Sequence, residues 1–326
     1  MVEVLRHSTD SEHGFSRQRR GKGFAYLDEK GKPISHRKTL ERLHALGIPP
    51  AWDAVWICQD PMGHLQVSGR DSKGRKQYVY HPLWTEQSSQ EKFERLREFG
   101  KALTKIRKRV AKDLAKRSLS KERVLAAIVR LLEESRVRVG NEQYARDNGS
   151  FGLTTMRNRH AKLTKERVTF RFKGKSGKVT EVSLRNRQLA SVVRKCQELP
   201  GQHLFEYFDE SGEVKSIGSK DVNDYLREIS GENFTAKDFR TWVATVEAVR
   251  LVRERGPESK RALAEIVKEV AELIHNTPTV CRKSYINPIV LEPRNVGMLI
   301  AMRGRKRPHI SEIESIIISD AFAKLS

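Results

Sequence analysis

Five residues between positions 138 and 285 have the side chains needed for nucleophilic chemistry at a phosphate. Tyr285 follows Asn276 by nine residues, and Arg138, Lys175 and Arg240 precede both. A phenol becomes a nucleophile when it loses its proton, and nearby cations stabilise the phenolate. The planar donor fork of an arginine matches two phosphate oxygens at once. The ordered set therefore contains the groups needed to break a phosphodiester without a metal ion or ATP.

The same residues also have ordinary structural explanations. Arg138 is expected to end a helix, where an arginine more often interacts with the helix dipole than with a substrate. Arg240 has Asp238 close by as an ion-pair partner, and Tyr285 could be packed with its hydroxyl bonded to a carbonyl. Neither arginine is specific by itself, so only the combination favours a site.

The segment around Lys175 predicts a β-hairpin. Residues 168–172 alternate apolar and polar, and a second strand passes through 182–184 after a turn rich in glycine and lysine. A long cationic side chain at such a tip can reach into a nucleic-acid groove. It can also protonate a departing oxygen if a neighbouring cation lowers its pKa. Lys173 and Lys178 compete with Lys175 for this role, and a solvated basic turn is the structural alternative.

Other chemistries lack the residues that they need. Gly174-Lys175-Ser176 resembles the end of a P-loop, but Thr169 occupies the first glycine position and the context is strand, turn, strand, which argues against nucleotide binding. No metal-ligand spacing occurs, and we expect no metal and no cofactor. Three cysteines lie too far apart in the sequence to suggest a zinc site or a disulfide framework: Cys58, Cys196 and Cys281.

The sequence around the tyrosine predicts two helices in succession. The apolar periodicity of residues 263–274 should end near Asn276. Thr277 then serves as the N-cap and Pro278 as the first residue of a new, short helix. Tyr285 is expected near the end of that short helix, beside two cations.

Composition limits the class of partner. The chain has 326 residues and a formal net charge of +22, with Lys and Arg spread along its whole length. The positive electrostatic potential of such a chain favours binding to a polyanion, above all to nucleic acid. The chain has no apolar stretch long enough to span a bilayer and no hydrophobic N-terminal signal region, so we expect no membrane association. Widely spaced, reduced thiols fit a cytoplasmic location.

The order of the patterns predicts an α+β protein of two domains. Short strand-like runs separated by Gly, Pro and Asp fill residues 20–85, with a helix near 36–46. Residues 85–90 read as a polar connector, after which helical periodicity dominates. We therefore expect a β-rich N-terminal domain at 1–88 and a larger, mainly helical catalytic domain at 89–326 that contains the hairpin.

Taken together, the motifs resemble those of the type IB DNA topoisomerases, specifically the compact poxvirus-like group found in bacteria. In the N-terminal part the resemblance rests on GFAYLDEKGKPI (23–34), IPPAWDAVWIC (48–58) and GHLQVSGRDSKGRKQYVYH (63–81). In the C-terminal part it rests on RVRVGNEQY (136–144), GLTTMRNRH (152–160), FKGKSGKV (172–179), KDFRT (237–241) and NTPTVCRKSYI (276–286). The resemblance implies the fold shared by tyrosine recombinases and type IB topoisomerases.

The resemblance assigns a role to each of the five residues. Arg138 and Arg240 become the two active-site arginines, Lys175 the general acid and Tyr285 the nucleophile. Asn276 occupies a position that is usually histidine in the viral and eukaryotic members, where it donates a hydrogen bond to a phosphate oxygen. An amide can donate in the same way, but it stays neutral at every pH.

The neighbouring His275 is not expected to replace that histidine. If the helix continues through this position, successive side chains differ by about 100° in direction, so His275 should point away from the site.

The resemblance also implies DNA contacts in the N-terminal part. Alternation along 77–81 puts two tyrosines on one face of a strand, where aromatic and basic groups can meet the major groove. The structural alternative is a sheet face packed on the domain core, and Trp52 and Trp56 are expected in that core. The implied DNA-contacting residues are Arg70, Lys73, Arg75, Lys76, Tyr78 and Tyr80.

The implied activity is relaxation of supercoiled duplex DNA through a transient 3′-phosphotyrosyl break, without ATP or metal. The resemblance further implies a monomer that clamps the duplex, binds no nucleotide and works in the cytoplasm at the nucleoid. A tyrosine recombinase is the nearest alternative, but those enzymes normally carry H-x-x-R where this chain has Lys237-Asp238-Phe239-Arg240. A basic architectural DNA-binding protein explains the charge but not the ordered motifs.

Overall fold

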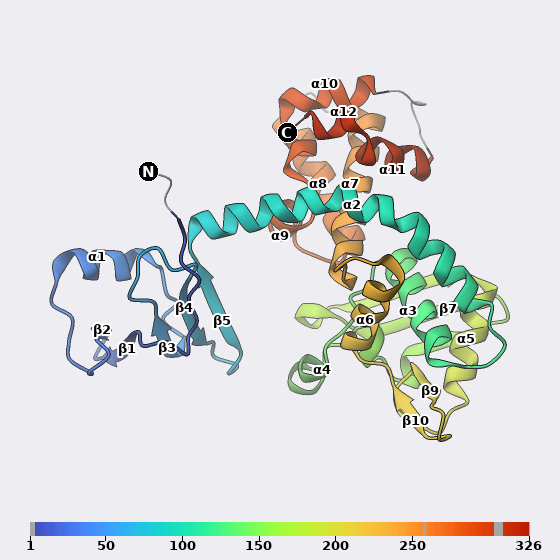
Figure 1. The fold of residues 1–326 in the computed structure, drawn as a ribbon, viewed down its shortest axis with the longest axis horizontal. Coiled ribbons are helices and arrows are strands. Elements are labelled where there is room, and N and C mark those ends of the chain that lie inside the picture. The colour runs from blue at the N-terminus through green and yellow to red at the C-terminus, as the bar shows by residue number, and fades with distance from the viewer. Residues whose placement is uncertain (1–3, 257–258, 303–308, 326) are drawn as a thin grey trace. The chain divides into compact units, whose positions relative to one another are not determined.

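The computed structural model describes residues 4–256, 259–302 and 309–325. The chain divides into two compact units, Met1–Lys92 and Phe93–Ser326 (Figure 1). Within the described ranges, no helix is both long enough and apolar enough to cross a membrane.

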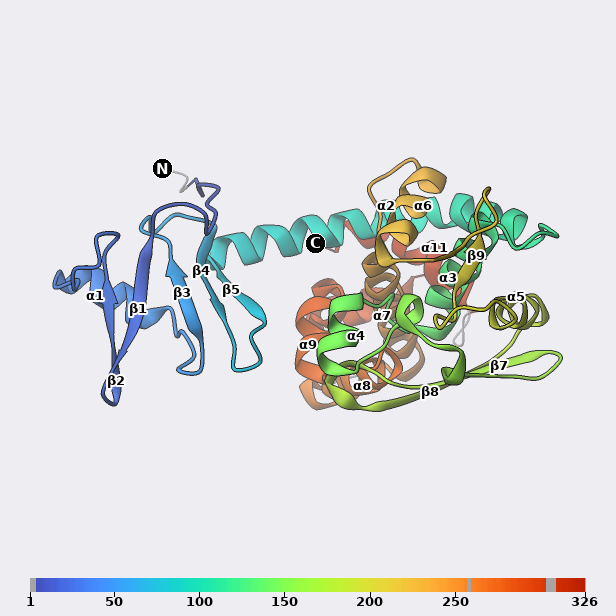
Figure 2. The same ribbon diagram turned by 90° about the horizontal axis from the view of Figure 1, so that it is seen from below.

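The N-terminal unit is a five-stranded antiparallel sheet with one helix. Its strands follow the order β2-β1-β3-β4-β5 (Figure 2). The elements are β1 (Phe15–Arg20), β2 (Gly23–Leu27), α1 (Arg37–Ala45), β3 (Asp53–Ile57), β4 (Leu65–Arg70) and β5 (Lys76–Tyr80). The helix expected near 36–46 and the strands expected from β2 to β5 are therefore confirmed.

Strand β1 was not predicted, because its sequence contains three arginines. Arg17 stands where an apolar residue would be expected. Its guanidinium donates hydrogen bonds of 2.8 Å to the carbonyls of Ile48, Pro49 and Trp52. These bonds satisfy the donors of a partly buried cation, so the strand tolerates it.

The two faces of this sheet differ. One face packs Ile57 and Val67 against Leu43 of α1, and all three residues are fully buried in the core. On the opposite face, Trp56 lies across from Ser68, and Ser68 from Tyr78. We call this second surface the open face of the sheet.

Residues 85–90 do not form the expected connector, because they lie inside α2 (Pro82–Leu114). The segment contains neither Gly nor Pro, and its Glu and Gln residues favour a helix. The hydroxyl of Ser89 donates to the carbonyl of Thr85 at 2.7 Å and so finds its partner within the helix. The compact units divide after Lys92, within α2, whereas the sequence predicted domains of 1–88 and 89–326.

The C-terminal unit is mainly helical, so the expected α+β class is confirmed. Its helices are α3 (Lys121–Ser135), α4 (Glu142–Asn148), α5 (Arg187–Gln197), α6 (Ser219–Ser230), α7 (Ala236–Arg255), α8 (Lys260–Leu273), α9 (Pro278–Ser284), α10 (Pro293–Ala301), α11 (Ile310–Ile318) and α12 (Asp320–Ala323). Its strands are β6 (Ala161–Leu163), β7 (Arg167–Lys173), β8 (Val179–Arg185), β9 (Glu206–Phe208) and β10 (Val214–Ser216). The predicted hairpin is β7–β8; β6 beside it and the β9–β10 hairpin were not predicted.

Helix α7 forms the centre of this unit. It packs against α3, α6, α8, α10 and α11, and it is buried on most sides. Near its N-terminal end, Phe239 meets Phe99 edge to face, with ring centroids 5.0 Å apart. A helix held in this way is a rigid support for the side chains of its first turns.

Candidate active site

Arg138 lies beyond a helix rather than at its end. Helix α3 stops at Ser135, and Arg136 is its C-cap in the left-handed region, with φ of 60°. The hydroxyl of Ser135 accepts a hydrogen bond from the backbone N–H of Val137, which is buried in the core. Burial of Val137 pulls the chain out of the helix, so the expected position of Arg138 was wrong.

The extended segment that carries Arg138 is held by a close approach of two backbones. Leu153 donates its N–H to the Arg138 carbonyl at 2.9 Å, and Thr154 donates to the next carbonyl at 2.7 Å. A Cβ on Gly152 would lie 2.5 Å from the backbone of Gly140. This approach is possible only because residue 152 is glycine.

Lys175 lies at the exposed tip between β7 and β8, as predicted. Lys173 pairs with Val179 at the end of the ladder, and the tip is closed by a hydrogen bond from Gly174 N–H to the Lys178 carbonyl at 2.8 Å. The carbonyl of Lys173 also accepts the N–H of Phe151 at 2.8 Å. Because Phe151 directly precedes Gly152, the hairpin and the Arg138 segment are tied together.

Arg240 projects from the start of α7 and is 5% exposed. Its two terminal nitrogens donate to the carbonyls of Arg136 at 2.5 Å and Ile274 at 2.6 Å. Asp238 instead accepts the N–H and hydroxyl of Thr235 and caps the helix. The ion pair between Arg240 and Asp238 that sequence offered as an alternative does not form.

The structure confirms the predicted helix break before Tyr285. Thr277 caps α9 and Pro278 is among its first residues. Tyr285 is the C-cap of this helix and is half-buried. The hydroxyl of Thr245 donates to the Tyr285 carbonyl at 3.3 Å and accepts the N–H of Asn287 at 3.1 Å. Helix α7 therefore fixes the backbone on both sides of the tyrosine.

Asn276 presents an unused donor. Its Oδ1 accepts the N–H of Thr277 at 3.0 Å, while its Nδ2 is buried and has no hydrogen-bond partner. Burying an amide N–H without a hydrogen-bond acceptor costs free energy. A ligand that supplies the acceptor would remove this cost, so the unpartnered Nδ2 indicates a binding position.

His275 does not lie on a helix, so the prediction that it points away from the site by one helical step of about 100° had the wrong basis. Helix α8 ends at Leu273, and His275 adopts a φ of 51°. Its carbonyl accepts a hydrogen bond of 3.1 Å from Arg138. Burial lowers the pKa of the His275 imidazole, and Arg240 lowers it next, followed by Arg138. The charges of both arginines therefore disfavour protonation of this imidazole.

The arginines also set the electrostatics of the tyrosine. Burial alone would raise the pKa of Tyr285, but the charge of Arg240, which lies 5.2 Å from the centre of the ring, acts in the opposite direction. Together with the charges of Arg138 and Lys175 it outweighs burial, so the pKa lies below the ordinary value. Burial and Arg240 in turn lower the pKa of Arg138 to about 10, which leaves it charged at neutral pH.

No carboxylate neutralises this cluster within the described part of the chain. None of the ion pairs among the described residues involves Arg138, Lys175 or Arg240. The groups that shift the pKa values of the two arginines include Tyr285 but no Asp or Glu. Cations that are buried and lack an acidic partner are typical of sites that bind an anion.

Four of the five predicted residues act on one another, because the charges of Arg240, Arg138 and Lys175 all reach Tyr285. Asn276 follows Ile274, whose carbonyl anchors Arg240, by two residues. The sequence missed three further residues, Arg136, Thr245 and His275. Arg136 and Thr245 act through a carbonyl and a hydroxyl that no sequence motif marks. His275 was expected to point away from the site, because a helix was predicted to continue through it.

The predicted DNA-contacting residues lie on the hairpin of β4 and β5. Tyr78 and Tyr80 are 45% and 42% exposed, and their rings stack with centroids 6.1 Å apart. They project from the open face, so the alternative of a core-facing strand is wrong for them. Trp52 packs against the core as expected, whereas Trp56 lies on the open face and donates from its indole N–H to the Glu12 carbonyl at 2.8 Å.

Both arginines of this hairpin have local partners. Arg70 donates to the Gly74 carbonyl at 2.8 Å, and Arg75 forms an ion pair of 2.6 Å with Asp71. Lys73 is exposed at the turn.

Two protein-family models match the chain. The model described as the catalytic core of eukaryotic DNA topoisomerase I matches residues 73–291. The model of the N-terminal domain of bacterial DNA topoisomerase IB matches residues 23–71. DNA topoisomerase 1B of Acanthamoeba polyphaga mimivirus is 34% identical over 300 residues, which cover 87% of this chain and 89% of that protein. DNA topoisomerase 1B of vaccinia virus (strain Copenhagen) is 24% identical over 250 residues, which cover 74% and 75% of the two chains.

These matches identify an enzyme of the isomerase class. The chain belongs to the type IB DNA topoisomerase family, as its motifs predicted. Among solved structures, the XerH site-specific recombinase in its pre-cleavage complex with difH substrate aligns with 62% of this chain and 52% of its own, at 15% identity and a TM-score of 0.38. A TM-score this low does not by itself identify a fold.

Proposed function

We propose that this protein relaxes supercoiled duplex DNA and that Tyr285 is its nucleophile. The observation that carries the proposal is the convergence of Arg138 and Arg240, without any acidic partner among the described residues, on a tyrosine of lowered pKa. Attack of the phenolate oxygen on a backbone phosphorus forms a 3′-phosphotyrosyl bond and breaks the bond to the 5′ oxygen.

The negative charge that grows on the phosphate is received by three donors. Arg138 and Arg240 supply guanidinium N–H groups, and Asn276 supplies its unpartnered Nδ2. A pre-placed donor of this kind contributes about 3 kcal/mol to transition-state stabilisation. Asn276 does so without a charge, so its contribution does not depend on pH.

Lys175 is proposed to give a proton to the departing 5′ oxygen. Its place at an exposed hairpin tip allows the side chain to reach into a DNA groove. The phosphotyrosyl bond retains roughly the energy of the phosphodiester, so the reverse attack by the 5′ hydroxyl reseals the strand without ATP. Neither a metal ion nor a nucleotide is needed in this scheme.

The N-terminal unit is proposed to bind the same duplex through the exposed hairpin of β4 and β5. We further propose that the chain acts as a monomer that clamps the duplex, in the cytoplasm and in association with the nucleoid. The excess of cations supports binding to DNA, with a strong dependence on salt.

Relaxation of supercoiled plasmid in EDTA, without nucleotide, tests the reaction. The wild-type protein should relax both signs of supercoil, and denaturation during the reaction should trap a covalent adduct. Tyr285→Phe should bind the plasmid but form no adduct. Relaxation by this variant at the wild-type rate would disprove the proposed role of Tyr285.

A further inference from the structure

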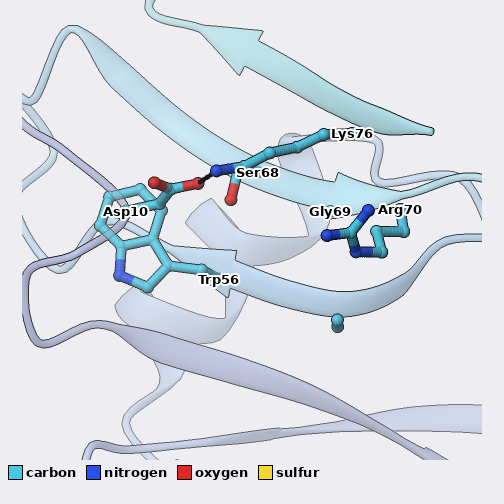
Figure 3. A pocket seen from close by; sticks show the side chains of 7 residues that line it. Asp10, Trp56, Ser68, Gly69, Arg70 and Lys76 are labelled. Atoms are coloured by element: carbon cyan, nitrogen blue, oxygen red, sulfur yellow. Dashed lines mark ion pairs between the residues drawn. The ribbon is translucent and has the colours of Figure 1, made fainter. Parts of the chain in front are cut away.

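The open face of the N-terminal sheet carries a carboxylate beside the residues predicted to contact DNA. Asp10, from the segment before β1, lies 2.6 Å from the Nζ of Lys76 on β5 (Figure 3). Exposed ion pairs of this kind contribute little to stability. A negative charge on a face that binds a polyanion therefore needs another explanation.

The carboxylate is held in place from two sides. The ammonium of Lys76 foremost, and then the hydroxyl of Ser68, hold the pKa of the Asp10 carboxyl below the usual range. Two residues further along, the Glu12 carbonyl accepts the indole N–H of Trp56 and fixes the segment to the sheet. Asp10 is thus ionised and positioned at neutral pH.

The ammonium of Lys76 is restrained in turn. A lysine normally places its charge on a flexible four-carbon stem. Here the Nζ is held by Asp10 and lies 5.6 Å from the centre of the Tyr78 ring. Beside it opens a pocket of about 240 Å³, lined among others by Trp56, Ser68 and Arg70 (Figure 3).

This geometry suits a base edge better than a phosphate. A carboxylate in contact with the ammonium repels an approaching phosphate and cancels part of the attraction. Base edges carry no net charge, and an oriented lysine can donate to the O6 and N7 atoms of guanine in the major groove. Contacts to base edges, unlike contacts to phosphates, distinguish sequences.

We propose that Asp10 is a positioning residue that determines specificity, because it directs Lys76 away from phosphates and toward guanine in the major groove. This inference rests on the proposed DNA binding of the open face. It assigns a role to the N-terminal segment, which none of the sequence motifs included.

Selection from a pool of short duplexes with randomised positions tests the inference. The full chain carrying Tyr285→Phe is used, so that binding is measured without covalent capture. Asp10→Asn should bind mixed-sequence DNA more tightly, since a negative charge is lost and Lys76 is released to the phosphates. Its preference for guanine should fall at least about fivefold, the lower end of what one well-placed base contact supplies.

Glu12→Gln is the matched control, because it removes the same charge from the same segment, where Glu12 pairs with Arg6 at 2.9 Å. It should strengthen overall binding in the same way and keep the guanine preference. Lys76→Gln should lose the preference by itself, and adding Asp10→Asn to it should cause no further loss.

Three results would overturn the inference: an unchanged preference in Asp10→Asn, an equal loss in Glu12→Gln, or a parent protein without base preference. Relaxation by the chain that retains Tyr285 is measured separately. Failure of the proposed reaction is therefore distinguishable from failure of base recognition.

Discussion

The guanidinium of Arg240 lies 5.2 Å from the centre of the Tyr285 ring while its two terminal nitrogens are bonded to backbone carbonyls. The cation that lowers the pKa of the phenol is therefore fixed by the chain around it and does not depend on a bound substrate. Because Arg240 also lacks an acidic partner among the described residues, its charge remains available to the phenolate and to a phosphate. The relationship between these two residues keeps a positive charge beside the phenol when no substrate is bound.

Arg240→Lys should reduce cleavage strongly although the charge is kept. A lysine has no fork, so it cannot bond to the carbonyls of Arg136 and Ile274 and also face Tyr285. We expect a loss of about 10²-fold or more in single-turnover cleavage of a duplex, and a loss of about 1–3 kcal/mol in the free energy of unfolding. Arg227→Lys, at an exposed position on α6, is the control and should change neither. Cleavage at the wild-type rate by Arg240→Lys would contradict the assigned role.

Two substitutions of Asn276 should show whether its N–H donor or the shape of its side chain supports cleavage. Asn276→Asp keeps the shape but replaces the unpartnered Nδ2 by an oxygen, so the side chain repels a phosphate. Asn276→Ala removes the donor without adding a charge and should cost about 10²-fold in single-turnover cleavage. We therefore expect the aspartate variant to cleave more slowly than the alanine variant. If Asn276→Asp cleaved as fast as the wild type, the amide would have no part in binding the phosphate.

Local signals predicted those parts of the site in which neighbouring residues decide the structure. The stop of α8, the cap at Thr277 and the proline at Pro278 all follow from propensities within a few residues. The same holds for the hairpin around Lys175, where alternation and glycines suffice. These predictions fixed the elements that carry Tyr285 and Lys175.

Long-range contacts decided the parts that the sequence did not predict. The carbonyls that anchor Arg240 come from residues 104 and 34 positions away. Arg136 and His275 adopt left-handed backbone conformations that favour glycine, and tertiary contacts hold them there. Strand β1 was missed because the carbonyls that satisfy Arg17 lie far away in the sequence. Residues 85–90 were predicted to be a linker because they are polar, although they form part of α2.

Titration should show that the pKa of Tyr285 lies below the ordinary value of a phenol. Because Arg240, Arg138 and Lys175 together outweigh burial, Tyr285 should ionise below the ordinary phenol pKa of about 10. The folded state then binds fewer protons than the unfolded state just below pH 10, so the stability that Tyr285 contributes should rise with pH across that window. The difference in phenolate absorbance between wild type and Tyr285→Phe isolates this group. A difference curve centred at or above the ordinary pKa would refute the expected shift.

Gly152→Ala should displace Arg138, although Gly152 is not itself one of the proposed catalytic residues. The added Cβ would lie 2.5 Å from the backbone of Gly140 and 2.6 Å from the Arg138 carbonyl, so the two segments must separate. We expect a loss of about 1–3 kcal/mol in the free energy of unfolding and slower cleavage, because Arg138 is displaced from the phosphate. The matched control is Gly297→Ala on α10, where a Cβ meets nothing within 4 Å. This change should stabilise the protein slightly, since alanine favours a helix, and leave cleavage unchanged. Denaturant unfolding and single-turnover cleavage measure both effects, and equal behaviour of the two variants would show that the close approach at Gly152 does not position Arg138.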